Sequence, residues 1–139
     1  MSLFETEYEL KIPFNDLDPM NIVWHGNYIK YMEQARCDMF DKLNYTYYDM
    51  KDDNYAYPIA KMNTKYISPL SFNQAIIVKV FLEEVEPAIR IKYNIFDKLS
   101  GDKVFEAETM QIAVDIKSRQ SLYEAPKRLL EKLGIKNEK

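Results

Sequence analysis

Hydrophobic and polar residues alternate along several segments of the chain, the pattern of strands with one buried and one exposed face. The clearest alternation covers residues 4–12, 76–83, 89–95 and 110–116, and residues 57–67 form a further strand-like run. Pro13, Pro87 and the turn-forming sequence at 98–102 separate these segments. The pattern therefore predicts long strands joined by short connections, which is typical of an antiparallel sheet.

One segment between the first two strands follows a helical period instead. Apolar residues recur at positions 28, 32, 35, 39 and 43, which predicts a helix of about four and a half turns. We expect Asn27 to cap its first turn and Asn44 to end it in the left-handed conformation. Residues 44–54 are expected to form a loop with one short helical turn, and 126–133 a short closing helix.

This order of elements predicts an α+β fold in a single domain, 1–139, with one helix against one antiparallel sheet. One such helix cannot cover both faces of a sheet of five or six strands. Phe81, Phe96 and Phe105 are expected to leave apolar surface on the uncovered face, and the sheet edges also need partners. We therefore expect a homodimer or homotetramer.

Composition narrows the range of partners. The net charge is −3, and the basic residues near the C-terminus alternate with glutamates, so no nucleic-acid partner is expected. Those basic residues are Lys127, Arg128, Lys132, Lys136 and Lys139. The single cysteine, Cys37, and the single histidine, His25, offer no disulfide and no metal cluster. We expect Cys37 to be buried and inert in the middle of the helix.

The beginning of the chain, MSLFETEYELK, has no basic and apolar leader pattern, and no apolar run approaches about 18 residues. These features predict a cytoplasmic protein without a membrane span.

Candidate chemistry is concentrated in one stretch, FNDLDPMNIVWHGNY, residues 14–28. Asp16 and Asp18 end a strand shortly before the helix begins, where free backbone N–H groups and the positive end of the helix dipole favour a negative charge. A carboxylate base and an oxyanion hole could share this region. The alternative is an Asx turn whose aspartates bond to neighbouring amides.

The longer stretch FNDLDPMNIVWHGNYIKYMEQAR resembles the signature of the 4-hydroxybenzoyl-CoA thioesterase branch of the hotdog-fold superfamily, and KYISPLSFNQAIIVKVFL resembles a second part of it. Together the similarity covers residues 4–120. It implies a long helix wrapped by a curved antiparallel sheet, dimers joined edge to edge and often tetramers. It also implies hydrolysis of an acyl thioester of coenzyme A or of an acyl carrier protein, without a cofactor, since coenzyme A is part of the substrate.

The resemblance implies roles for individual residues. The catalytic carboxylate of the family corresponds to Asp18, and its oxyanion donor to the backbone N–H of His25, with Gly26 beside it. Asp16 is then the turn-former. Asn21 stands where the family usually has glycine, and asparagine tolerates the left-handed backbone that such a turn needs. Asn73 and Gln74 also depart from the family pattern, which affects the placement of the substrate.

Further residues are predicted to bind the substrate. Candidate substrate-binding residues are Trp24, Asn27, Tyr28, Met32, Ile59 and Tyr66. Candidate partners of the coenzyme A phosphates are Lys65, Arg90, Lys92 and Arg119, chosen because they flank strand ends or point outward. No metal ligand is predicted.

Several alternatives stay open. A thiolate leaves easily because thiol pKa values lie near 8.5, so one base and one oxyanion hole can suffice. Asp18 either activates a water or attacks the carbonyl itself, and the side chain of His25 either orients groups or only accompanies its N–H. Glu33 is spaced for an ion pair with Lys30 or Arg36, with a pocket-facing carboxylate as the alternative. A non-catalytic acyl-binding module is the main competing function; a hotdog dehydratase would carry different motifs.

Overall fold

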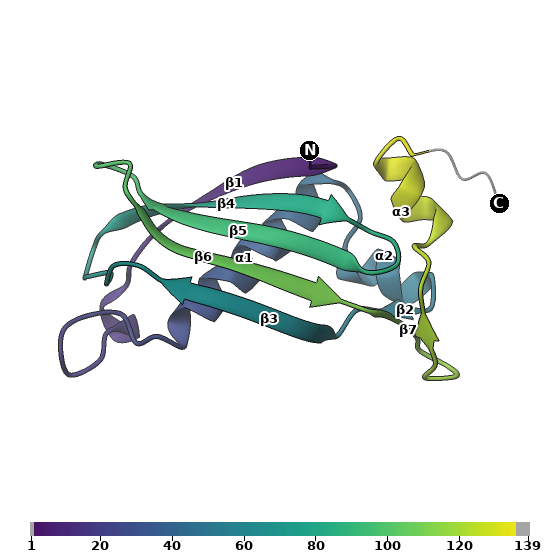
Figure 1. Ribbon diagram of the computed structural model, residues 1–139, viewed down its shortest axis with the longest axis horizontal. Coiled ribbons are helices and arrows are strands. Elements are labelled where there is room, and N and C mark those ends of the chain that lie inside the picture. The colour runs from purple at the N-terminus through teal and green to yellow at the C-terminus, as the bar shows by residue number, and fades with distance from the viewer. Residues whose placement is uncertain (1, 136–139) are drawn as a thin grey trace.

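The computed structural model describes residues 2–135 as a long helix packed across one face of a five-stranded antiparallel sheet (Figure 1). The helix is α1 (Asn27–Lys42), and the strand order is β1-β4-β5-β6-β3. The strands are β1 (Phe4–Lys11), β3 (Ile59–Tyr66), β4 (Ala75–Glu84), β5 (Ile89–Asp97) and β6 (Lys103–Gln111). The predicted α+β class and its arrangement of one helix on one antiparallel sheet are confirmed.

Smaller elements gather at the end of the sheet away from the start of α1 (Figure 1). They are α2 (Tyr47–Asp52), β2 (Tyr55–Ala56), β7 (Ala113–Asp115), β8 (Ser121–Leu122) and α3 (Lys127–Lys132), and a 3-10 turn, η1 (Phe14–Asp16), follows β1 at the opposite end. Strands β2, β7 and β8 form a separate three-stranded sheet.

Two predicted strands have boundaries that differ from those in the structure. The prediction of one strand over 57–67 is wrong at its start, because the chain leaves β2 before Pro58, which has no N–H for a ladder, and begins β3 after it. The prediction of one strand over 110–116 is also wrong, because β6 ends at Gln111 and β7 pairs with β2 and β8. At Gln111 the apolar alternation continues while the pairing partner changes.

The core lies between α1 and the inner face of the sheet. Met32, Ala35 and Met39 on the helix are at most 1% exposed, and Val78 and Val80 of β4 are fully buried opposite. Burying each large apolar side chain stabilises the fold by roughly 1.5–3 kcal/mol before the entropy of ordering is counted. The two periods in the sequence, about 3.6 for α1 and 2 for the strands, therefore identified the two surfaces that form this core.

The outer face of the sheet is mixed rather than broadly apolar. Phe81 and Phe96 are half-buried there, and the ammonium of Lys79 lies 5.1 Å from the ring centroid of Phe96. The prediction that Phe105 is part of this face is wrong: Phe105 is fully buried on the inner face beside Tyr28. A shift of register between Ile95 and Phe96 breaks the strict alternation near this point.

The segment after α1 is more helical than predicted. Asn44 is left-handed, with φ 63°, as expected of the residue that ends α1. The expected helical turn in 44–54 is the six-residue helix α2, which begins with a capping box formed by Thr46 and Asp49. Arg128 of α3 forms ion pairs with Asp49 and Asp53 and so joins α3 to this segment.

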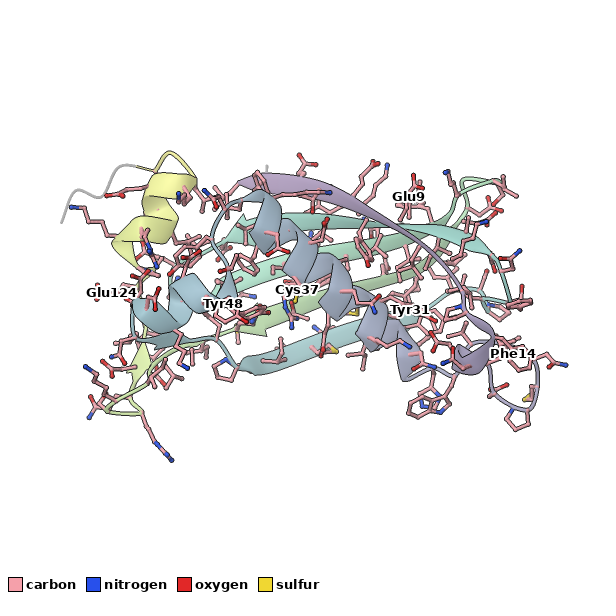
Figure 2. The ribbon with its side chains drawn as sticks, turned by 180° about the vertical axis from the view of Figure 1, so that it is seen from behind. Glu9, Phe14, Tyr31, Cys37, Tyr48 and Glu124 are labelled. Atoms are coloured by element: carbon pink, nitrogen blue, oxygen red, sulfur yellow. The ribbon has the colours of Figure 1, made fainter. Side chains whose placement is uncertain are left out.

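Cys37 lies midway along α1 (Figure 2) and is exposed, so the prediction of a buried cysteine is wrong. Lys136 and Lys139, part of the basic set considered above, lie outside the described residues. Over residues 2–135, no helix combines the length and apolar character needed to cross a membrane.

Candidate active site

Residues 14–28 fold back on themselves at the end of the molecule where β1 stops and α1 starts (Figure 1). A tight turn runs from Asp18 to Asn21, closed by the Asn21 N–H donating to the Asp18 carbonyl at 3.0 Å. Asn21 has φ 64°, so asparagine does occupy a left-handed position, as predicted. The returning chain is fixed by the Val23 N–H, which donates to the Leu70 carbonyl at 2.8 Å.

The two aspartates of this segment have different surroundings. Asp16 is only 4% exposed, and its carboxylate accepts from Lys30 Nζ at 2.5 Å and from the Tyr31 hydroxyl at 2.7 Å. Burial opposes its ionisation, but these hydrogen bonds outweigh burial and lower the pKa of Asp16 below its ordinary value. Burial and the Asp16 carboxylate raise the pKa of Tyr31. Asp16 is thus a buried anion whose side chain bonds to α1, while its backbone N–H closes the 3-10 turn η1 by donating to the Pro13 carbonyl at 3.1 Å.

Asp18 begins the next turn, from residue 18 to residue 21. It is partly exposed, and its Oδ1 accepts from the Met20 N–H at 2.8 Å. Its Oδ2 has no hydrogen-bond partner within the described residues, so one oxygen is available to a water or a substrate. The Asp18 N–H donates to the carbonyl of Ile22 at 2.8 Å, which places the Asp18 backbone beside the segment that continues to α1.

The start of α1 differs from the prediction at Asn27. Asn27 is the first helical residue, Gly26 precedes it, and no side chain caps the helix. The Asn27 side-chain amide instead donates to the carbonyl of Asp16 at 2.9 Å, and the Trp24 N–H donates to the same oxygen at 3.1 Å. The prediction of an Asn27 cap is therefore wrong, and the N–H groups of His25 and Gly26 have no acceptor among residues 2–135.

Position 26 requires glycine because a neighbouring side chain leaves no room for a Cβ, and not because its backbone conformation is unusual. Its φ of −65° is open to any residue. A Cβ at this position, however, would lie 2.2 Å from Cζ3 of Trp24, because the indole ring covers the glycine. The group that approaches the glycine is therefore the ring of Trp24, which is itself 50% exposed.

A cavity of about 270 Å³ opens beside this helix start. It is lined by Ile22, Val23, His25, Tyr28, Tyr66, Ile67, Ser68 and Pro69. The Tyr66 hydroxyl donates to the carbonyl of His25 at 3.0 Å, and the rings of Tyr28 and Tyr66 meet edge to face with centroids 5.0 Å apart. The structure thus brings together three predicted residues, His25, Tyr28 and Tyr66, and places Asp18 next to Ile22 at the rim.

The other residues predicted to bind the substrate do not line this cavity. Met32 is 1% exposed in the core, and Ile59 is at the opposite end of β3 from Tyr66, about 23 Å away along the strand. Trp24 and Asn27 flank the cavity without lining it. Five further wall residues were not predicted: Ile22, Val23, Ile67, Ser68 and Pro69. The last three belong to the family-like motif KYISP.

The residues predicted to bind the coenzyme A phosphates lie in different parts of the molecule. Lys65 and Lys92 line one open concavity of about 400 Å³ on the outer face of the sheet, together with Lys103. Arg90 instead forms ion pairs with Glu84 and Glu108. Arg119 lies in the turn between β7 and β8, at the end of the molecule away from the cavity (Figure 1).

The predicted ion pairs of Glu33 are wrong. Lys30 pairs with Asp16, and Arg36 is buried, where its guanidinium donates to the hydroxyls of Tyr47 and Tyr93 at 3.2 and 3.5 Å. Within residues 2–135, no cluster of three or more His, Cys, Asp or Glu side chains could hold a metal ion.

The sequence profile of the thioesterase-like superfamily matches residues 12–133, almost the whole chain. The chain belongs to this superfamily. The Bacillus subtilis protein named "Putative acyl-CoA thioesterase YneP" is 27% identical over 111 residues, which cover 79% of this chain and 80% of that protein. The resemblance to hotdog-fold thioesterases is therefore confirmed.

Two solved structures share the fold of this chain. A hypothetical protein from Aquifex aeolicus superposes with a TM-score of 0.82 at 26% identity, covering 92% of this chain and 98% of that one. The DHNA-CoA thioesterase from Staphylococcus aureus superposes with a TM-score of 0.78 at 24% identity, covering 86% and 80%. The hotdog architecture, a long helix against an antiparallel sheet, is the fold of this chain.

Proposed function

We propose that this protein hydrolyses an acyl-CoA thioester to the free acid and coenzyme A. Its membership of the thioesterase-like superfamily and the name of its B. subtilis relative support this activity. The observation that carries the proposal is the pair of backbone N–H groups at His25 and Gly26, which have no acceptor in the described chain and adjoin a cavity.

These amides form the oxyanion hole. They stand at the positive end of a sixteen-residue helix, where negative charge is stabilised, and no side-chain cap competes for them. The thioester carbonyl accepts from them, so they stabilise the charge that develops on its oxygen during attack. Removing one such donor costs about 100-fold to 1000-fold in rate in well-studied hydrolases.

Asp18 supplies the attacking group. Its turn hydrogen bond to Met20 fixes one oxygen and leaves the other open. In one route this oxygen takes a proton from water, which adds to the carbonyl; in the other it adds to the carbonyl, and the mixed anhydride is then hydrolysed. Either route expels coenzyme A as a thiolate, which needs no strong acid. Single turnover in ¹⁸O-water identifies the anhydride route when water attacks the Asp18 carbon of the anhydride, because the label then enters Asp18 and the released acid stays unlabelled.

The same proposal includes a dimer joined through β3. This strand lies at the edge of the sheet, and seven of its eight residues are exposed. An open edge of this length presents unpaired backbone groups, and pairing with a second copy satisfies them. Light scattering coupled to size-exclusion chromatography measures the mass: a dimer or tetramer supports this part of the proposal, and a monomer contradicts it.

The test of the activity is release of free thiol from a panel of acyl-CoAs of different chain lengths and of aryl-CoAs, with acyl carrier protein thioesters as a second panel. Turnover of the coenzyme A esters supports the proposal. Turnover of the carrier-protein esters alone would identify acyl carrier protein thioesters as the substrate in place of acyl-CoA. Binding without turnover in both panels would favour a non-catalytic acyl-binding module.

A further inference from the structure

Asp16 joins the two halves of the candidate site. Its carboxylate accepts from Lys30 and Tyr31, in the first turns of α1, at 2.5 and 2.7 Å. Its carbonyl accepts from the Trp24 N–H and from the side chain of Asn27 at 3.1 and 2.9 Å. One buried residue therefore receives four hydrogen bonds from four residues that surround the oxyanion N–H groups.

Asp16 does not take part in the reaction directly. It is 4% exposed, it does not line the cavity, and both carboxylate oxygens already accept hydrogen bonds. A carboxylate buried to this extent is costly unless it is paired, and both oxygens of Asp16 are paired, with Lys30 and Tyr31. A buried charge with directed donors fixes geometry better than apolar contacts do, because each hydrogen bond tolerates little displacement.

The connection to Asp18 is short. Leu17 is the only residue between the two aspartates, and it forms an isolated β-bridge with Val23, which lines the cavity. Holding Asp16 against α1 therefore fixes the Asp18 turn on one side and the Trp24 to Gly26 backbone on the other. Both reacting components, the carboxylate and the free amides, then keep one relative position.

We propose that Asp16 is a positioning residue, which acts through its bonds to Lys30, Tyr31, Trp24 and Asn27 to hold the Asp18 turn in register with the oxyanion N–H groups. This inference rests on the proposed function. A displacement of about 1 Å between a catalytic group and its substrate can cost about 100-fold in rate. We therefore expect Asp16→Asn to lower kcat by about 10-fold to 100-fold, with KM changed less than about threefold.

The kinetic test combines Asp16→Asn with Asp18→Asn. Because Asp16 acts through Asp18, the double variant should be no slower than Asp18→Asn alone. The control is Asp38→Asn, which removes a carboxylate of α1 that forms an ion pair with Lys42 at 2.8 Å and does not line the cavity; its kcat should equal that of the unaltered protein. Unchanged kcat in folded Asp16→Asn, or a further loss in the double variant, would overturn the proposal.

A second readout does not depend on catalysis. Trp24 is the single tryptophan of the chain, and its backbone N–H donates to the Asp16 carbonyl. Its fluorescence therefore reports the position of the backbone from Trp24 to Gly26. Asp16→Asn should increase acrylamide quenching of Trp24, and Asp38→Asn should leave it unchanged. If the unaltered protein hydrolyses no thioester, the proposed function fails, and quenching still decides whether Asp16 holds the segment: unchanged quenching overturns that claim.

Two milder variants cover the case in which Asp16→Asn does not fold. Tyr31→Phe removes one hydrogen bond to the carboxylate and keeps the ring, and Lys30→Met removes the other. Each should lower kcat and increase Trp24 quenching in the same direction as Asp16→Asn but by less. Normal kcat and normal quenching in both variants would refute the positioning role.

Discussion

Gly26→Ala tests whether glycine is required at this position by its backbone conformation or by the lack of space for a Cβ. The backbone at this position is helical, with φ −65° and ψ −24°, so alanine alone should stabilise the fold by about 0.4–1 kcal/mol. The new Cβ, however, would lie 2.2 Å from the indole ring of Trp24. The ring must retreat by at least about 1.2 Å to reach ordinary van der Waals contact.

The cost follows from how much of the ring is buried. Trp24 is 50% exposed, so swinging it fully into water exposes roughly 100 Å² more apolar surface, worth about 2.5 kcal/mol. After the gain from alanine, the free energy of unfolding should fall by about 1.5–2 kcal/mol if the ring leaves completely, and by less if it slides. For a domain of this size, the full loss lowers Tm by about 4–8 °C.

The assay combines thermal unfolding with the emission maximum and quenching of Trp24. We expect a lower Tm, a red-shifted and more quenchable tryptophan, and reduced thiol release. The control is Gly101→Ala: Gly101 has φ 78° with nothing near its would-be Cβ, so that variant should lose about 1–2 kcal/mol through backbone strain without altering Trp24 fluorescence. A raised Tm with unchanged fluorescence in Gly26→Ala would refute the ring contact.

Three further predictions follow from individual contacts. Tyr66→Phe removes the donor to the His25 carbonyl, so kcat should fall about 10-fold with a change in stability of about 1 kcal/mol or less, measured by thiol release and urea unfolding; an unaltered kcat would contradict it. Tyr93→Phe takes an acceptor from the buried Arg36 and should cost about 1–3 kcal/mol in urea unfolding, whereas a neutral result would show that this hydroxyl is dispensable. Because the pKa of Asp16 is lowered from 3.8 in the folded state, its ionised form stabilises the fold above that pH and loses this effect as pH falls below it, so the stability difference between the protein and Asp16→Asn should shrink between pH 5 and pH 3; a constant difference would contradict this sign.

The sequence could predict features that depend on local periodicity. Alternation over 4–12 and the helical spacing after Asn27 matched β1 and α1, because burial on one face requires those periods. It could not predict where a strand changes its partner. The interruption at Pro58 and the end of β6 at Gln111 depend on which sheet each segment joins, and apolar alternation is the same in both sheets.

In the candidate site, too, local features could be predicted and contacts between distant residues could not. The motif located the segment, the left-handed Asn21 and the free amides before α1, all of which follow from turn and helix-end chemistry. The buried hydrogen bonds of Asp16 were not predictable, because its partners Lys30 and Tyr31 are fourteen and fifteen residues away and meet it only after folding. Asn27 was misassigned because a carbonyl outside the helix competes for its side chain.

The most direct test of the account is thiol release by Asp18→Asn, measured beside the unaltered protein on the best acyl-CoA of the panel. The substitution keeps size and the turn acceptor but removes the charge, so Tm should change by less than about 3 °C while kcat falls about 1000-fold or more. Turnover within a few-fold of the unaltered protein, at equal Tm, would contradict the assignment of Asp18 as the catalytic carboxylate.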